Sequence, residues 1–227
     1  MIKAIFFDFF KTLALWPGPD PEDDLIREFN LKVPYLQVER AIAATKMMWN
    51  DSTPQHEMYN EGVMKNYREI VLNSLGLEVN DENTDKLERI LQAASDRTEI
   101  HPDAVYVVKE LRDKGYITGL ITSTWPHPMK DYVYCKEFGK LFDIIVPSCN
   151  TGYVKPDKEI FNLALSKIFV EAEDAVMVGD SLRSDIKGAK DAGMKTIFYD
   201  PEGKYKEKPF EADYKVRELR EISNLSF

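Results

Sequence analysis

The stretch IKAIFFDFFKTL, residues 2–13, opens the chain with a run of apolar side chains that ends in one carboxylate, Asp8. Similar short apolar runs recur at residues 116–121, 142–147, 174–179 and 195–199. Runs that are apolar throughout are typical of parallel strands covered by helices on both faces. Helical patterns accompany these runs, at residues 102–115, 158–168 and 181–193. This alternation predicts an α/β fold with a doubly wound parallel sheet.

The interval from Trp16 to Arg97 departs from this pattern. It begins with the breaker cluster WPGPDP (16–21), and a second breaker, IHPD (100–103), follows it. Between them the sequence shows helical periodicity at residues 23–30, 36–50, 56–76 and 85–95 and no convincing strand. We therefore predict a helical domain at residues 16–97, inserted into an α/β domain formed by residues 1–15 and 98–227.

Charge and cysteine content narrow the classes of function. The chain has 227 residues and a formal net charge of −9, which argues against nucleic-acid and anionic-membrane partners because both require a basic surface. Cys135 and Cys149 are too few for a disulfide scaffold. No run reaches the roughly 18 apolar residues that a membrane helix needs. We expect a cytoplasmic enzyme or binding module with no nucleic-acid or membrane partner.

Polar residues follow several of the predicted strands. Asp8 follows the first strand, Thr122 and Ser123 follow the second, and Asp180 follows the strand that ends at Gly179. In open α/β sheets, ligands bind beyond the carboxyl ends of the strands. These side chains are therefore expected to meet at one edge, together with Lys155 from the loop TGYVKPD (151–157).

Four short motifs occur in order: FFDFFKTL (6–13), LITS (120–123), VKPD (154–157) and VGDSLRSDI (178–186). In these motifs the chain resembles the haloacid dehalogenase-like hydrolase superfamily, whose members commonly carry a helical cap after the first motif. The resemblance implies a Rossmann-like core with an inserted cap, in which Asp8 is the covalent nucleophile.

The same resemblance assigns the other site residues. It implies that Thr122 and Lys155 hold the transferred group, with Ser123 beside them in substrate binding. It also implies that Asp180 and Asp185 serve a magnesium ion together with Asp8. The third protein ligand in the family is a backbone carbonyl, which here belongs to Phe10.

Elementary electrostatics agrees with a metal ion at this edge. Lys155 supplies one positive charge against Asp8, Asp180 and Asp185, and crowded carboxylates cannot all stay ionised without a cation. Mg²⁺ prefers oxygen ligands, and it takes one or two carboxylates together with substrate phosphate. A carboxylate is a sufficient nucleophile for phosphoryl transfer if the electrophile is held in line and its charge is neutralised.

Phe10 is the main departure from the family pattern. Family phosphatases usually place an aspartate there as general acid and base, a role that is typically worth about 10²–10⁴ in rate. The leading expectation is therefore a magnesium-dependent phosphatase that acts slowly on a small phosphorylated metabolite through an aspartyl phosphate. Lys11 is a second departure, because glycine is most common at that position.

Two alternatives stay open. The first is a 2-haloacid dehalogenase with an Asp8 ester intermediate, because that branch carries an aromatic residue at position 10 and releases a halide that needs no proton. Its substrate-holding cap arginine has Arg40 as the nearest candidate, whereas the branch typically works without the metal acids that this chain retains. The second alternative is a regulatory module that binds an anion and a metal with little turnover.

Overall fold

The structure is a computed structural model that describes residues 1–15, 17–43, 60–129, 137–205 and 212–226. Its main sheet has the strand order β5-β4-β1-β6-β7-β8, and all neighbours run parallel. These strands are β1 (Ala4–Phe7), β4 (Ile117–Thr122), β5 (Ile144–Pro147), β6 (Ala175–Gly179), β7 (Lys195–Tyr199) and β8 (Tyr214–Val216). The prediction of an α/β fold with a parallel sheet is confirmed.

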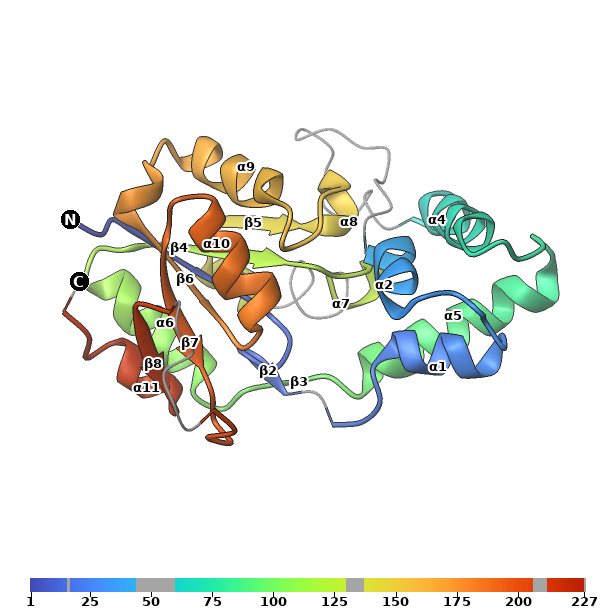
Figure 1. The fold of residues 1–227 in the computed structure, drawn as a ribbon, viewed down its shortest axis with the longest axis horizontal. Coiled ribbons are helices and arrows are strands. Elements are labelled where there is room, and N and C mark those ends of the chain that lie inside the picture. Colours follow the sequence, from blue (N-terminus) through green and yellow to red (C-terminus); the bar gives the residue numbers. More distant parts are fainter. Residues whose placement is uncertain (16, 44–59, 130–136, 206–211, 227) are drawn as a thin grey trace.

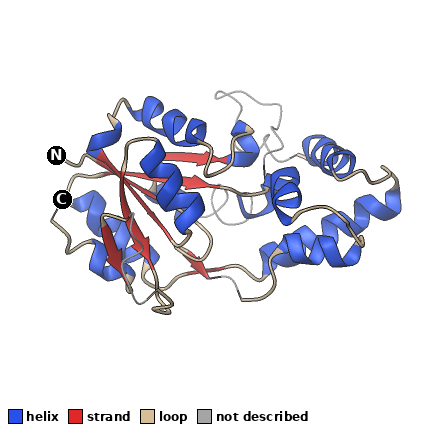
Figure 2. Cartoon of the chain, in the orientation of Figure 1, coloured by secondary structure: helices blue, strands red, loops and turns tan. Residues whose placement is uncertain are grey.

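Helices cover both faces of this sheet, as Figures 1 and 2 show. On one face α9 and α10 pack against Ala4 and Phe6, and on the other α6 and α11 belong to the core that contains Ile5 and Phe7. Successive side chains of a strand point to opposite faces, which is why every residue of β1 is apolar and buried. The helices are α6 (Ala104–Asp113), α9 (Lys158–Ile168), α10 (Gly188–Asp191) and α11 (Leu219–Ile222).

The centre of the sheet is tightly packed around β1. Gly119 of β4 lies beside Phe6, and a Cβ at that glycine would come within 2.3 Å of the Phe6 ring. The chain runs from β1 outward through β4 and β5 and then returns to β6 on the other side of β1. Ligands of open α/β sheets bind at such a reversal of strand order, so the topology directs attention to the carboxyl end of β1.

Between β1 and β4 the chain forms helices that pack against one another beside the sheet (Figure 1). We call these the inserted helices: α1 (Pro21–Glu28), α2 (Tyr35–Ala43), α4 (Glu61–Ser74) and α5 (Asp81–Asp96). The side chains of Asn60 and Asn80 accept hydrogen bonds from the first turns of α4 and α5, which fixes where these helices begin. A two-stranded antiparallel ladder, β2 (Ala14–Leu15) with β3 (Glu99–Ile100), joins the two ends of the insertion.

Several details differ from the sequence-based expectations. Within residues 17–43 and 60–97 the insertion contains no strand, as predicted, and the parts of the predicted helices at residues 44–59 lie outside the described residues. The helix predicted at residues 181–193 is a π-helical segment, η4 (Leu182–Lys187), followed by α10. The short strand β8 was not predicted, and neither were β2 and β3. The division into domains at residues 16–97 stays a prediction.

None of the described helices is long and apolar enough to cross a membrane.

Candidate active site

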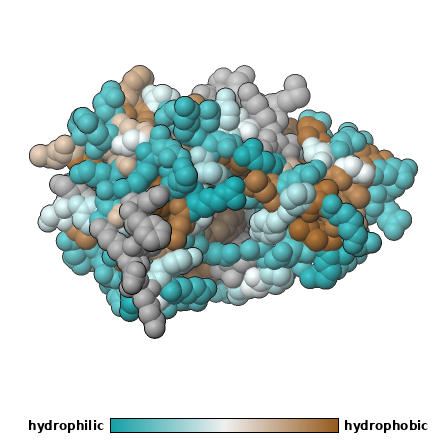
Figure 3. All heavy atoms as spheres, in the orientation of Figure 1, coloured by the Kyte–Doolittle hydropathy of each residue, from teal (hydrophilic) through white to brown (hydrophobic). Residues whose placement is uncertain are grey.

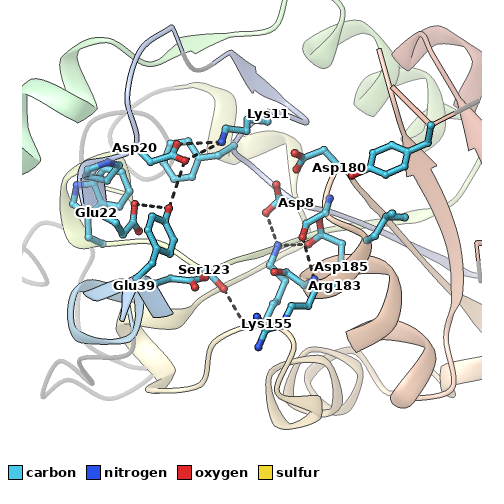
Figure 4. Close-up of a pocket in the computed structure, with 18 residues that line it drawn as sticks. Asp8, Lys11, Asp20, Glu22, Glu39, Ser123, Lys155, Asp180, Arg183 and Asp185 are labelled. Carbon is cyan, nitrogen blue, oxygen red and sulfur yellow. Dashed lines mark hydrogen bonds and ion pairs between the residues drawn. The ribbon is translucent and has the colours of Figure 1, made fainter. Parts of the chain in front are cut away.

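A cavity of 530 Å³ opens at the carboxyl end of β1, between the sheet and the inserted helices. Figure 3 shows the molecule hollowed near the centre of the drawn face, and Figure 4 shows the lining side chains. The volume is typical of a small-molecule site, which usually measures about 300–1,000 Å³. The described lining residues are Asp8, Phe10, Lys11, Asp20, Pro21, Glu22, Tyr35, Glu39, Ser123, Trp125, Lys155, Asp180, Ser181, Leu182, Arg183, Ser184, Asp185 and Tyr205.

A buried lysine joins two carboxylates at the sheet end of the cavity. Lys155 Nζ donates to Asp185 Oδ1 over 2.6 Å and forms a second ion pair with Asp8 Oδ1. The exposed fractions of Asp8, Lys155 and Asp185 are 6%, 3% and 1%. The other oxygen of Asp8 accepts a hydrogen bond from the Thr12 hydroxyl over 3.3 Å. Three of the predicted site residues are therefore brought into direct contact.

The chain around Gly179 is shaped to bring Asp185 inward. A Cβ at Gly179 would lie 2.2 Å from Asp185 Oδ2, so no larger residue fits there without moving the carboxylate. The backbone N–H of Ser181 donates to the same oxygen over 3.0 Å, and the Ser181 hydroxyl accepts from the N–H of Ser184 over 3.1 Å. Short π-helical segments such as η4 occur frequently at functional sites.

Three carboxylates meet at this end of the cavity. Asp8, Asp180 and Asp185 can each offer one oxygen atom such that the three atoms lie within 4.8 Å of one another. Burial raises the pKa of Asp8 to about 6, with Lys155 opposing the shift and Asp185 adding to it. Burial and the neighbouring acids raise the pKa of Asp180 to about 8. For Lys155, burial lowers the pKa, but the two carboxylates outweigh burial and raise it.

The charge and the ligand atoms of this cluster suit a divalent cation. The three acids together carry more negative charge than Lys155 neutralises. Burial raises the pKa values of Asp8 and Asp180, and repulsion by neighbouring acids adds to both shifts. Carboxylate oxygens are the donors that Mg²⁺ prefers. The donor set therefore fits magnesium, with Asp8, Asp180 and Asp185 as the acids that would hold it. The backbone carbonyl of Phe10 as a further ligand stays a prediction.

Thr122 and Ser123, the two hydroxyl residues at the end of β4, differ in their surroundings. The Thr122 hydroxyl is fully buried and has no hydrogen-bond partner among the described residues, and Thr122 is not among the described residues that line the cavity. Ser123 lines the cavity, and its hydroxyl accepts a hydrogen bond from the backbone N–H of Lys155 over 3.0 Å. Ser123 thus fixes the loop that carries the lysine, while a substrate role for either hydroxyl stays a prediction.

Phe10 lines the cavity with an aromatic partner. Its ring stacks on Trp125 with the centroids 5.2 Å apart and the planes 10° apart. The structure places Trp125 in the cavity wall against Phe10. Neither side chain can transfer a proton, so this part of the wall is apolar.

The inserted helices contribute an opposing wall that the sequence did not indicate. Glu22, Tyr35 and Glu39 line the cavity from α1 and α2, together with Asp20, the residue before α1. The Tyr35 hydroxyl lies 3.3 Å from Glu22 Oε2 and 3.4 Å from Asp20 Oδ2. Burial raises the pKa of Tyr35, so this hydroxyl stays protonated and donates. No local pattern distinguishes these residues from an ordinary helix surface, because their role depends on how the insertion is oriented.

Lys11 and Arg40, the two basic residues considered in the sequence analysis, each form an ion pair with an aspartate. Lys11 adopts a left-handed backbone conformation with φ 59°, which explains why glycine is common at this position, and its Nζ lies 3.1 Å from Asp20 Oδ1. Arg40 Nη2 lies 3.1 Å from Asp157 Oδ1, and Arg40 is not among the described lining residues. This placement gives no support to Arg40 as the arginine of a haloacid site.

Sequence comparison relates the chain to named phosphatases. A glyceraldehyde 3-phosphate phosphatase from Pyrococcus furiosus is 38% identical over 125 residues, which are 53% of this chain and 52% of that protein. A phosphoserine phosphatase from Thermus thermophilus is 29% identical over 126 residues, which are 56% of this chain and 51% of that protein. The chain therefore spans about half the length of these curated relatives.

Solved structures and a family model complete the comparison. A haloacid dehalogenase-type phosphatase from Thermococcus onnurineus superposes with a TM-score of 0.63 at 22% identity, covering 98% of this chain and 97% of the other. A 2-haloacid dehalogenase from Pseudomonas syringae superposes with a TM-score of 0.62 at 22% identity, covering 99% and 97%. At such identities the likeness concerns the fold. Residues 2–193 match the model described as haloacid dehalogenase-like hydrolase, and the chain therefore belongs to this family.

Proposed function

We propose that the protein is a magnesium-dependent phosphatase that hydrolyses a small phosphorylated metabolite through a phosphorylated Asp8. The observation that carries this proposal is the buried contact of Lys155 with Asp8 and Asp185 beside a third acid, Asp180. The names of the relatives from P. furiosus and T. thermophilus support a phosphate ester as substrate.

Each residue of the site has its own role in the proposed phosphoryl transfer. A carboxylate oxygen of Asp8 attacks phosphorus, forming an acyl phosphate and breaking the bond to the ester oxygen. Lys155 and Thr122 bind the equatorial oxygens of the transferred group, whose charge they offset. Water then attacks phosphorus, releases inorganic phosphate and restores the Asp8 carboxylate. Asp8, Asp180, Asp185 and the Phe10 carbonyl would hold Mg²⁺, which would supply further positive charge near the transferred group.

Phe10 sets the rate in this proposal. The departing alkoxide needs a proton, and neither Phe10 nor its partner Trp125 can give one. Unless the inserted helices or a water molecule supply it, we expect slow turnover and a steep dependence of rate on the pKa of the leaving alcohol. Fast turnover that is independent of the leaving group would contradict this role of Phe10.

The test is release of phosphate from an activated aryl phosphate, with magnesium and with a chelator, by the wild-type protein and by Asp8→Asn. Asn keeps the shape of the side chain and removes the nucleophilic charge. We expect release that requires magnesium and disappears in Asp8→Asn. A matched control is Asp157→Asn, because this acid belongs to the neighbouring loop and pairs with Arg40 outside the buried cluster.

The two alternatives predict other results from the same preparations. A dehalogenase would release halide from a 2-haloacid whether or not a chelator is present. A binding module would gain melting temperature from a phosphorylated ligand in magnesium while no phosphate accumulates. Either result, without aryl phosphate hydrolysis, would overturn the proposed phosphatase.

A further inference from the structure

One wall of the cavity carries three carboxyl groups. We call Asp20, Glu22 and Glu39 the acidic wall. Figure 4 shows it across the cavity from Asp8 and Lys155. Asp20 pairs with Lys11, whereas no lysine, arginine or histidine of the described residues forms an ion pair with Glu22.

Glu22 is buried although no basic side chain in the described part of the chain forms an ion pair with it. Its exposed fraction is 8%, and its described side-chain partner is the neutral hydroxyl of Tyr35. Burial raises the pKa of Glu22 to about 7, and Asp20 and Glu39 add to the shift. Burial also raises the pKa of Glu39, although Arg183 opposes that shift. A buried carboxyl group either takes up a proton or pairs with a cation, so a cationic ligand in this cavity would pair with the ionised form of Glu22.

The charge of the whole cavity leads to the same conclusion. Of the described lining residues, six carry carboxylates, and three carry cationic groups, namely Lys11, Lys155 and Arg183. A phosphate monoester brings about −1.5 to −2 charges at neutral pH. The sheet end of the cavity can balance that charge with Lys155 and a metal ion, but neither lies on the acidic wall.

The rest of the substrate must therefore meet the acidic wall. A carboxylate there would be repelled, and a neutral alkyl group would leave Glu22 without a counter-ion. An ammonium group would form an ion pair with it. The stacked rings of Phe10 and Trp125 line the same cavity, and such apolar walls strengthen charge–charge attraction and favour cations over aromatic faces.

We propose that the substrates are zwitterionic phosphomonoesters, in which an ammonium group on the alcohol portion pairs with Glu22 of the acidic wall. This inference rests on the proposed phosphatase function and specifies its substrate class. It makes Glu22 a residue that determines specificity by binding the end of the substrate remote from phosphorus.

The test compares two phosphonates of equal length, aminopropylphosphonate and butylphosphonate. Their carbon–phosphorus bonds are not hydrolysed, so a difference between them reports the ammonium group and not the leaving alcohol. Inhibition of aryl phosphate hydrolysis is measured for wild type, Glu22→Gln and Glu78→Gln. Glu78 is an exposed acid between α4 and α5 and is not among the described lining residues, so it is the matched control.

We expect wild type and Glu78→Gln to bind aminopropylphosphonate about 10-fold or more tightly than butylphosphonate, the usual worth of a hydrogen bond to a charged group. Glu22→Gln should lose most of this preference and bind butylphosphonate as wild type does. Equal inhibition by both compounds in wild type would overturn the ammonium proposal while leaving the phosphatase proposal intact. If Glu22→Gln weakened the binding of both phosphonates equally, Glu22 would have a structural role, and the ammonium proposal would also be overturned.

A failure of the phosphatase proposal can be distinguished from a failure of the ammonium proposal. If wild type does not hydrolyse aryl phosphates, calorimetric titration of the two phosphonates in magnesium decides the ammonium preference directly. Glu39→Gln is a second variant of the acidic wall and should reduce the preference less than Glu22→Gln, because Glu39 already lies near Arg183.

Discussion

Replacing Lys155 by methionine tests whether one buried ammonium group holds the acidic end of the cavity together. Lys155 Nζ lies 2.6 Å from Asp185 Oδ1 and also contacts Asp8. Methionine keeps a long unbranched side chain and removes the charge. In the absence of a metal ion, the two carboxylates then stay buried without their counter-ion.

The magnitude follows from these contacts. At an effective dielectric constant of about 20, an ion pair with charges about 4 Å apart gains roughly 4 kcal/mol, and Lys155 makes two such pairs. Loss of the ammonium also removes its own desolvation cost of several kcal/mol. The net loss in the free energy of unfolding should be about 3–5 kcal/mol, as for other buried pairs that lose one partner. For a chain of this size, the melting temperature should fall by roughly 6–20 °C.

The assay is urea unfolding followed by tryptophan fluorescence, with a chelator present, because Trp125 is buried beside the site. Lys187→Met is the matched control: Lys187 pairs with Asp191 on the surface, where an ion pair is worth about 0.5 kcal/mol. Adding Asp185→Asn to Lys155→Met should recover part of the loss, because it removes one uncompensated carboxylate. If Lys155→Met proves as stable as Lys187→Met, the electrostatic account of the site is wrong.

Three further substitutions test other parts of the structure. Gly179→Ala should push the Asp185 carboxylate out of place and lower magnesium affinity, measured by titration, by about 10–100-fold. Phe10→Asp should raise kcat/KM for alkyl phosphates by about 10²–10⁴ by restoring an acid and base, with a smaller gain for aryl phosphates. Glu88→Gln should cost about 1 kcal/mol at neutral pH, because the side chain is one-third exposed and solvent screens its pairs. Burial alone would raise the pKa of Glu88, but His127 and Arg68 lower it to about 2, so the cost should vanish as pH falls from about 4.5 to about 2.

Each of these substitutions has a control within the chain. Gly62→Ala, on α4, should leave magnesium affinity unchanged. Phe10→Leu keeps an apolar side chain and should show no gain on alkyl phosphates, and a gain equal to that of Phe10→Asp would refute the proton-transfer argument. For Glu88→Gln, a stability difference that grows as pH falls from about 4.5 to about 2 would contradict the ion pairs of Glu88 with His127 and Arg68.

The parallel sheet could be predicted because buried strands are apolar throughout, as in β1 and β6. The proximity of Asp8 and Asp180 at two strand ends could be predicted because the topology of such sheets gathers these ends at one edge. Strand β8 was missed because only one of its three residues, Val216, is both apolar and buried, and Tyr214 and Lys215 are partly exposed at the sheet edge. The ladder of β2 with β3 was missed because two-residue strands carry no periodicity.

The acidic wall could not be predicted for a different reason. Glu22 and Glu39 belong to amphipathic helices, where an acid normally faces water. The packing of α1 against α2 accompanies the burial of Glu22, whose side chain lines the cavity. Local sequence signals report which residues prefer the surface, and they do not report which part of that surface another element covers.

The missing acid at Phe10 and the acidic wall are connected through the leaving group. An ammonium group a few bonds from the ester oxygen stabilises the developing alkoxide by its charge, and so it partly replaces the proton that Phe10 cannot give. The gain from Phe10→Asp should therefore be smaller for aminoethyl phosphate than for propyl phosphate, which has the same length and no charge. The ratio of kcat/KM between variant and wild type, measured for both esters, tests this coupling. An equal gain for the two esters would mean that the ammonium group serves binding alone and that the missing acid is compensated elsewhere.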